Sequence, residues 1–250
     1  MFFKSIDKKI FIMKICLITT NEENIFVPKG VNYLIDNFKD IDVICVPGFS
    51  SMKRNIYFLF LLYFSELIQV IFIKIRGIFL KTRFKKNFIP LNSVNSEQFI
   101  SLIKKNKYEL IVSYNCPQII NSENLDQISK LNIELVNFHP GILPKYRGLF
   151  TNFYSLKNKE REAGITLHKI SKKIDGGEIL SIFKIPIENH DTIYDLYKKI
   201  YLSEDSLNFV VNSIKNYNQI KNKIRSSNDN CKYNSYPEFI DILKYRIKKF

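Results

Sequence analysis

The sequence predicts an α/β fold built on a doubly wound, mostly parallel sheet. Short apolar runs recur along the chain, and stretches with helical periodicity separate them. Several of these runs end at polar or turn-forming residues, which is where parallel sheets place their functional loops. A hydrophobic fraction of 46% in 250 residues is enough for the core of one domain of ordinary size.

The first half of the chain alternates strands and helices. Residues 14–19 form a short apolar run that is typical of a first parallel strand. Residues 28–38 place apolar side chains at helical spacing, which predicts a helix. The same reasoning predicts strands at 41–46, 109–113 and 134–137 and a helix at 95–105 with Ser96 as its N-cap.

The second half begins with two further strands and then becomes helical. Residues 164–170 and 178–186 are predicted strands on either side of a loop. Residues 192–214 carry one continuous helical pattern, with Thr192 in an N-cap sequence. A polar linker at 218–234 and a short amphipathic helix at 237–248 follow. We therefore expect a main domain at 13–190 and a C-terminal helical extension at 191–250 that is not an independent domain.

One segment, residues 56–80, is more apolar than the rest and allows three interpretations. Residues 56–64 are apolar without a break and basic residues flank the segment, but Glu66 and Gln69 lie in its middle. A carboxylate at bilayer depth costs about 2.5–3.5 kcal/mol, which disfavours a membrane span. A helix buried in the core or in a homodimer contact, and a helix making peripheral contact with a membrane surface, are the alternatives.

The composition is basic and poor in cysteine pairs. The formal charge of +14 favours polyanionic partners such as nucleic acid, anionic membranes or phosphorylated small molecules, although the base composition of an AT-rich genome would produce the same charge. The four cysteines are widely separated and the histidines lack ligand spacing, so we expect no disulfide framework and no metal. With no signal-peptide pattern at the N-terminus, we expect a cytoplasmic protein, membrane-associated only if residues 56–80 contact lipid.

Three polar side chains occupy positions where strands should end. Asn137 and His139 are two residues apart, so a strand would direct both to one side, and Pro140 would end that strand; Asp175 lies in a later loop. Together they suit the attack of an amine on a carbonyl carbon without a metal. The amide can donate a hydrogen bond to the developing oxyanion, the imidazole can accept the amine proton, and the carboxylate can relay it. His168, midway along an apolar strand, is more consistent with a structural role.

The motifs around these residues resemble the signature of the folate-dependent formyltransferases. They are Asn-Phe-His-Pro-Gly-Ile-Leu-Pro-Lys-Tyr-Arg-Gly at 137–148, Gly-Ile-Thr-Leu-His at 164–168, and Asp175, Gly177 and Ile179 in Asp-x-Gly-x-Ile. The family includes glycinamide ribonucleotide, methionyl-tRNA and sugar-nucleotide formyltransferases. The resemblance implies a Rossmann-like formyltransferase fold, a catalytic domain at 13–190 and a catalytic trio of Asn137, His139 and Asp175. It also implies N10-formyltetrahydrofolate as the formyl donor.

The resemblance further implies where the folate binds. The pterin would lie against the loop that follows the strand at 109–113, with Asp175 closing the other side. The expected contacts in that loop are Tyr114, Asn115, Cys116, Pro117 and Ile119. The loop departs from the more usual family pattern, which has glycine at about the place of Asn115.

The resemblance is strongest to enzymes that act on nucleotide-linked amino sugars, as in O-antigen biosynthesis. Residues 151–154, Thr-Asn-Phe-Tyr, partly match a Pro-Asn-x-Trp run in those members, and the expected substrate residues are Lys145, Arg147 and Asn152. A glycine-rich turn typical of purine members is missing at 19–24, and the residues after Pro186 are too few for the barrel of tRNA-acting members. Glycinamide ribonucleotide, methionyl-tRNA and a non-catalytic module of a membrane glycan complex stay open as alternatives.

Overall fold

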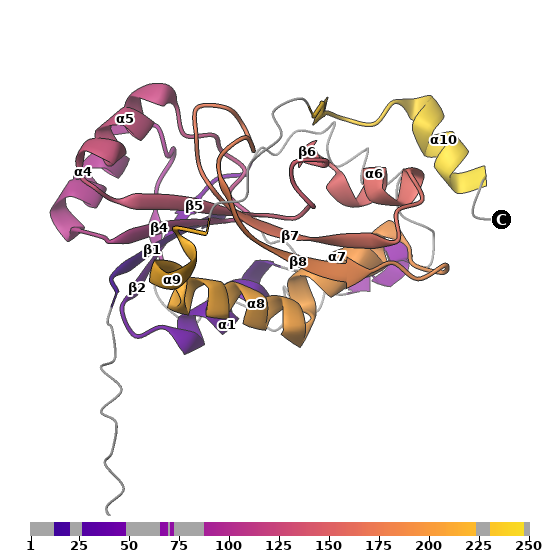
Figure 1. Ribbon diagram of the computed structural model, residues 1–250, viewed down its shortest axis with the longest axis horizontal. Coiled ribbons are helices and arrows are strands. Elements are labelled where there is room, and N and C mark those ends of the chain that lie inside the picture. Colours follow the sequence, from indigo (N-terminus) through magenta and orange to yellow (C-terminus); the bar gives the residue numbers. More distant parts are fainter. Residues whose placement is uncertain are drawn as a thin grey trace, which may run out of the picture.

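The predicted α/β fold is confirmed by the computed structural model, which describes residues 13–20, 27–48, 66–69, 71–72, 88–223 and 231–247. Within these residues a seven-stranded sheet has the order β3-β2-β1-β4-β5-β7-β8 (Figure 1). The pairs from β3 to β5 are parallel, whereas β7 is antiparallel to both of its neighbours. The strands are β1 (Ile15–Thr20), β2 (Ile41–Val46), β3 (Ile89–Pro90), β4 (Leu110–Tyr114), β5 (Glu134–His139), β7 (Glu162–Lys169) and β8 (Ile179–Pro186).

Helices cover both faces of the sheet. Strand β1 is buried throughout, and its alternate residues enter two different hydrophobic clusters, Ile15 and Leu17 on one face and Cys16 and Ile18 on the other. This alternation explains why a central strand reads as a continuous apolar run. The first cluster includes residues of α1 (Val27–Asn37), α7 (Ile193–Leu202) and α8 (Glu204–Lys215), and the second includes residues of α4 (Glu97–Asn106) and α5 (Ser122–Lys130).

The helix predicted at 192–214 is two helices, which corrects the sequence interpretation. Its start is confirmed, because Thr192 and Asp195 form a capping box at the beginning of α7. Ser203 then adopts an extended conformation, φ −69° and ψ 143°, and its hydroxyl accepts a hydrogen bond from the Ser206 amide at 3.3 Å. The serine side chain thus caps a new helix at a point where the apolar periodicity does not reveal a break.

The linker predicted at 218–234 is wrong at both ends, because residues 218–220 belong to a helix and residues 233–234 to a strand. Tyr233 and Asn234 form β9, which pairs in parallel with β6 (Arg147–Gly148) in a separate two-stranded sheet. A strand of two residues has no periodicity to detect. The chain reaches this strand after α9 (Tyr217–Ile220) and continues into α10 (Phe239–Ile247), which packs on α6 (Thr151–Lys157) through a buried contact between Phe153 and Tyr245.

The apolar segment at 56–80 lies largely outside the described residues. Its described part, residues 66–69 and 71–72, is helical, with the Glu66 side chain buried and Ile68, Ile71 and Phe72 exposed. Among the residues that the structure describes, no helix is both long and apolar enough to cross a membrane. The choice between a core or dimer helix and a membrane-surface helix stays a prediction.

Candidate active site

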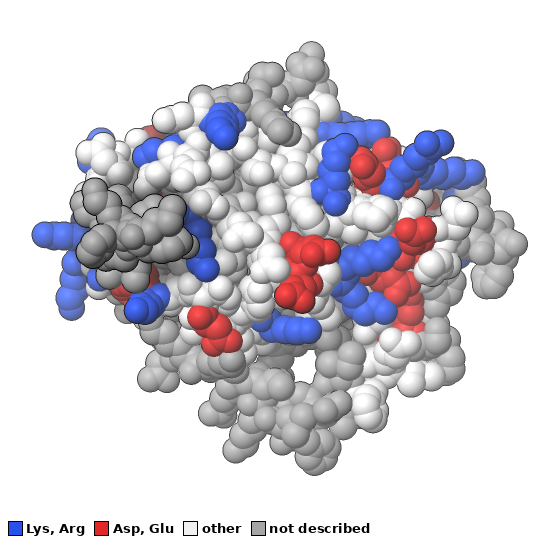
Figure 2. Space-filling model, turned by 60° about the horizontal axis from the view of Figure 1, so that its bottom comes forward, with Lys and Arg blue, Asp and Glu red and all other residues white. Residues whose placement is uncertain are grey.

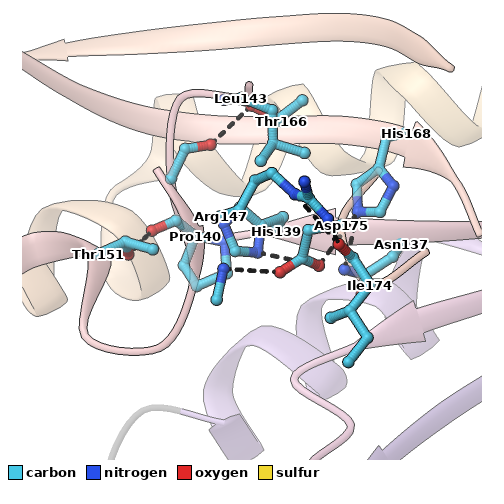
Figure 3. Close-up of polar contacts among 12 residues, drawn as sticks. Asn137, His139, Pro140, Leu143, Arg147, Thr151, Thr166, His168, Ile174 and Asp175 are labelled. Carbon is cyan, nitrogen blue, oxygen red and sulfur yellow. Dashed lines mark hydrogen bonds and ion pairs between the residues drawn. The ribbon is translucent and has the colours of Figure 1, made fainter. Parts of the chain in front are cut away.

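The carboxyl end of β5 carries the first two members of the predicted trio. Asn137 and His139 both belong to this strand, which lies between β4 and the antiparallel β7. In the register with β7, Asn137 is opposite His168 and His139 is opposite Thr166. Side chains at paired positions share one face of a sheet, so four polar groups gather on the same side (Figure 3).

Thr166 fixes the loop that leaves β5, a role that the sequence analysis missed. Its fully buried hydroxyl donates to the Gly141 carbonyl at 2.6 Å and accepts from the Leu143 amide at 3.0 Å. The Thr151 hydroxyl donates to the carbonyl of Pro140 from the start of α6. The turn after His139 is therefore held from β7 and from α6. Only the register between β5 and β7 identifies Thr166 as a partner of this loop.

Asp175 reaches the same place from the loop between β7 and β8. Its φ is +48°, in the left-handed region that aspartate tolerates better than most residues. One carboxylate oxygen accepts a hydrogen bond from the Gly148 amide at 2.9 Å, and the Arg147 guanidinium donates to the carbonyl of Ile174. At Gly177 an added Cβ would lie 1.9 Å from the Lys169 carbonyl oxygen, so this loop packs closely against the end of β7.

The trio converges. His139 Nδ1 lies 3.6 Å from Asp175 Oδ1, and the imidazole is buried. His139 Nε2 lies 2.6 Å from the Tyr146 carbonyl oxygen. Because a carbonyl only accepts hydrogen bonds, Nε2 carries a proton, and Nδ1 is the nitrogen available for proton transfer on the side of Asp175. Figure 3 shows the carboxylate lying between the two imidazoles, close to Asn137.

His168 belongs to the same cluster. Its Nε2 lies 3.1 Å from Asn137 Nδ2 and 3.8 Å from Asp175 Oδ1, and its Nδ1 lies 2.8 Å from the Lys169 carbonyl oxygen. Burial, with a further contribution from His139, lowers the pKa of His168 to about 4, although Asp175 opposes the shift. His168 is therefore neutral at physiological pH.

The loop predicted to bind the pterin leaves the carboxyl end of β4, beside the end of β5. Asn115 has φ +55°, a conformation in which glycine is unstrained and asparagine is tolerated, and this explains how asparagine can stand in a place where glycine is more usual. Tyr114 is only 3% exposed and packs against Phe138 and Tyr201, so its side chain faces the core. Ile119 is 57% exposed and offers an apolar surface for a flat ring.

The other two residues of this loop, Cys116 and Pro117, lie between these extremes of exposure. Both are partly buried, and burial raises the pKa of the Cys116 thiol to about 11, so this cysteine is a poor nucleophile at neutral pH. The thiol donates to the Gln118 carbonyl oxygen at 3.6 Å, which holds the loop in shape.

The three predicted substrate residues lie in different environments. Lys145 is exposed and forms an ion pair with Glu160 at 2.6 Å. Arg147 is buried and holds the Asp175 loop through Ile174. Asn152 is 2% exposed in the first turn of α6, so of the three it is the least accessible to a ligand. Their roles towards a substrate stay predictions.

Metal-ligating side chains do not cluster in the part of the chain that the structure describes. No group of three or more histidine, cysteine, aspartate or glutamate side chains there could hold a metal ion. The donors that do gather are an amide, an imidazole and a carboxylate, which suit proton transfer to and from an amine.

Comparison with known families decides the assignment of the chain. The family model described as formyl transferase matches residues 77–211, which is more than half of the chain. The chain belongs to the formyl transferase family. The match includes β7, β8, strand β5 with Asn137 and His139, and the loop with Asp175.

Curated members of the formyl transferase family are similar over part of their length. The chain is 39% identical over 150 residues to the bifunctional polymyxin resistance protein ArnA of Wigglesworthia glossinidia brevipalpis, covering 60% of the chain and 22% of that protein. It is 29% identical over 130 residues to a methionyl-tRNA formyltransferase of Finegoldia magna, covering 52% of the chain and 41% of that protein. The chain thus spans less than half of either relative.

Solved structures in the formyl transferase family share the fold. A sugar N-formyltransferase from Shewanella sp FDAARGOS_354 superposes with a TM-score of 0.57 and 22% identity, covering 94% of this chain and 88% of that one. At this identity the likeness supports the fold, and the substrate has to be inferred from the site.

Proposed function

We propose that the chain transfers a formyl group from N10-formyltetrahydrofolate to the amine of a nucleotide-linked amino sugar. The observation that carries this proposal is the convergence of Asn137, His139 and Asp175, with 3.6 Å between the imidazole and the carboxylate. These groups come from a strand and from a loop 38 positions apart at their extremes in the printed sequence.

The residues divide the work of acyl transfer to an amine. When bound, the folate supplies the formyl carbon to which the amine nitrogen bonds as the bond to N10 breaks. Asn137 donates an N–H to the formyl oxygen as negative charge develops there. His139 Nδ1 accepts the proton that the amine loses, and Asp175 stabilises the resulting imidazolium. The proton then passes by way of Asp175 to the leaving nitrogen, which departs as a neutral amine.

The neighbouring loop suits a flat donor molecule. Backbone groups of residues 115–117 lie at the carboxyl end of β4, and the exposed Ile119 side chain offers an apolar contact beside them. The direction of the Tyr114 side chain leaves only its backbone for such a contact. These features fit a pterin edge read by main-chain groups, as the family resemblance implies.

The acceptor side is completed by the C-terminal segment. Strand β9 lies beside β6, and the Leu149 amide donates to the Asn234 carbonyl at 2.8 Å. The Tyr233 ring packs over Gly148, whose amide binds Asp175, yet Tyr233 remains 39% exposed. Burial and the nearby Asp175 raise the pKa of Tyr233. An exposed aromatic ring next to the reacting groups suits a sugar or a base of the acceptor.

A solved relative supports this choice of ligands. An N-formyltransferase from Helicobacter canadensis, with a TM-score of 0.51 and 22% identity, was solved in complex with folinic acid and dTDP-3-aminofucose. We infer that the acceptor of this chain is of the same chemical class, a nucleotide-linked amino sugar.

Methionyl-tRNA is the second candidate acceptor. The similarity to methionyl-tRNA formyltransferases and the charge of +14 favour it. On the face shown in Figure 2, however, basic and acidic side chains lie intermixed, and ion pairs such as Lys198–Asp195 use part of the positive charge. A face that binds RNA typically gathers its basic side chains into a patch or stripe.

An acceptor panel tests the proposal. Purified chain and N10-formyltetrahydrofolate are incubated with dTDP- and UDP-linked amino sugars, glycinamide ribonucleotide and methionyl-tRNA, and formylated product is measured by mass spectrometry. We expect turnover of an amino sugar, reduced by a factor of about 10²–10⁴ in Asp175→Asn and His139→Ala. Turnover of methionyl-tRNA alone would reverse the order of the candidates, and equal rates in wild type and both variants would refute the catalytic assignment.

A further inference from the structure

His168 is built into the site through two hydrogen bonds of opposite direction. It is 2% exposed and faces Asn137 across the β5–β7 pair. Its Nδ1 contacts the Lys169 carbonyl oxygen at 2.8 Å. Its Nε2 contacts the side-chain nitrogen of Asn137 at 3.1 Å (Figure 3). Because the Lys169 carbonyl can only accept a hydrogen bond, it determines which ring nitrogen of His168 carries the proton.

The position of this proton determines the donor and the acceptor in both hydrogen bonds of His168. His168 Nδ1 must carry a proton in order to donate to the Lys169 carbonyl. A neutral imidazole then has a lone pair at Nε2, and its partner must be a donor, which is the N–H and not the carbonyl oxygen of the Asn137 amide. Burial keeps His168 neutral, as does the positive charge that His139 acquires on protonation.

The consequence for Asn137 is a single amide orientation. We propose that His168 is a positioning residue that holds the Asn137 amide with its nitrogen side towards the reacting centre, so that the second N–H is available to the formyl oxygen. The inference rests on the proposed formyl transfer, in which that N–H stabilises the developing oxyanion. Without an acceptor at His168 Nε2, a rotation of the amide would place the Asn137 oxygen where the donor is needed, and two oxygens bearing negative charge would repel.

Of the charged groups around His168, His139 and Arg147 favour its neutral form, whereas Asp175 opposes it. Asp175 faces His168 from the β7–β8 loop with its Oδ1 at 3.8 Å from Nε2, His139 faces it from β5 with ring centroids 6.2 Å apart, and Arg147 acts on it from β6. Asp175 is itself only an acceptor when ionised and cannot replace the lone pair that His168 offers to Asn137.

A double-mutant cycle separates positioning from a general structural role. In His168→Leu, which removes the acceptor, we expect kcat to fall at least about tenfold while KM for the folate changes less than about twofold, since one oxyanion donor typically contributes about 10²–10³ in rate. His168→Gln, which can donate and accept in the same two directions, should recover most of that loss. In an Asn137→Ala background, His168→Leu should have almost no further effect.

Two outcomes of the double-mutant cycle would contradict a positioning role for His168. Additive effects of the two substitutions, or a kcat of His168→Leu equal to that of the wild type, would overturn the proposal. Thermal unfolding of each variant shows whether a loss of rate reflects loss of the fold, and in that event the spectroscopic measurement below decides.

The tautomer of His168 gives a measurement that does not depend on turnover. In ¹⁵N-labelled wild-type chain, NMR at pH 7 should show a neutral imidazole protonated at Nδ1 and unprotonated at Nε2. An Nε2–H tautomer or an imidazolium would overturn the proposed hydrogen-bond direction. A wild-type chain that formylates no acceptor would instead refute the proposed function, so the two failures are distinguishable.

Discussion

Strand β5 and the loop that carries Asp175 position their catalytic groups in different ways. Asn137 and His139 are held by the paired backbones of β4 and β7 on either side. Asp175 depends on a left-handed backbone conformation, one amide from Gly148, and the close packing of Gly177 against Lys169. The strand distributes its support over many bonds, whereas the loop relies on a few individual atoms.

This difference locates the weak points of the site. A small substitution in the loop should displace one catalytic group without unfolding the sheet. On the strand, the groups that matter are the cross-strand partners: His168 contacts the Asn137 side chain, and Thr166 holds the backbone of the loop that follows His139.

The largest effect is expected at Gly177. An added methyl group would lie 1.9 Å from the Lys169 carbonyl oxygen, so Gly177→Ala must move the loop and Asp175 with it. We expect formyl transfer to fall at least about 100-fold, as for a displaced catalytic group, with a destabilisation of about 1–3 kcal/mol. Gly176→Ala is the matched control, because its methyl group meets only the flexible Lys173 side chain. Similar rates in the two variants would show that the loop tolerates displacement.

The next effect concerns the strand side and depends on pH. His168 has a pKa of about 4 in the folded chain against 6.5 ordinarily, so between these values the unfolded chain binds a proton that the folded chain does not. The free energy of unfolding should therefore decrease as the pH falls below about 6.5, by about 2 kcal/mol at pH 5, and this loss should level off below pH 4. Urea unfolding at pH 7.5 and pH 5 measures it. In His168→Gln the free energy of unfolding should decrease less between pH 7.5 and pH 5 than in the wild type. An equal decrease in the two proteins would contradict the lowered pKa of His168.

A smaller effect is expected where the loop meets the C-terminal segment. Gly148 has φ +90°, and a Cβ there would lie 2.2 Å from the Asn234 carbonyl oxygen. Gly148→Ala should separate β9 from β6 and weaken the hydrogen bond from the amide of residue 148 to the Asp175 carboxylate. We therefore expect KM for the acceptor to rise about tenfold, with less change in KM for the folate. Steady-state kinetics with each substrate varied would reveal the selectivity. Equal changes in both KM values would indicate that β9 supports the whole site and not its acceptor side.

The smallest effect lies away from both regions. Thr192→Ala removes the N-cap of α7, which should lower the free energy of unfolding by about 1 kcal/mol. Formyl transfer at 25 °C should stay within about twofold of wild type, since α7 contributes no group to the trio. Chemical denaturation and initial rates provide the two measurements, and a large loss of rate would mean that the C-terminal helices act on the site.

Sequence reasoning was most successful where a regular strand presents the residue. The alternation of Asn137 and His139, followed by Pro140, was sufficient to place two groups at one strand end. Asp175 could be joined to them only through the family resemblance, because its approach depends on contacts with Gly148 and Lys169 that are distant in sequence.

Other features required the three-dimensional register. The roles of His168 and Thr166 follow from being opposite Asn137 and His139 in an antiparallel pair, and periodicity specifies a strand but not its partner. Strand β9 is too short for any pattern, and the break at Ser203 depends on a side chain competing for one backbone amide.

The pairing of β6 with β9 has a consequence for the biosynthesis of the protein. A nascent chain emerging from the ribosome has all seven strands of the main sheet, and the trio, well before Tyr233 and Asn234 are translated. The fold can therefore assemble while the segment beside Asp175 is still absent. Full competence of the site should appear only once Tyr233 and Asn234 have been added, after the sheet itself has formed.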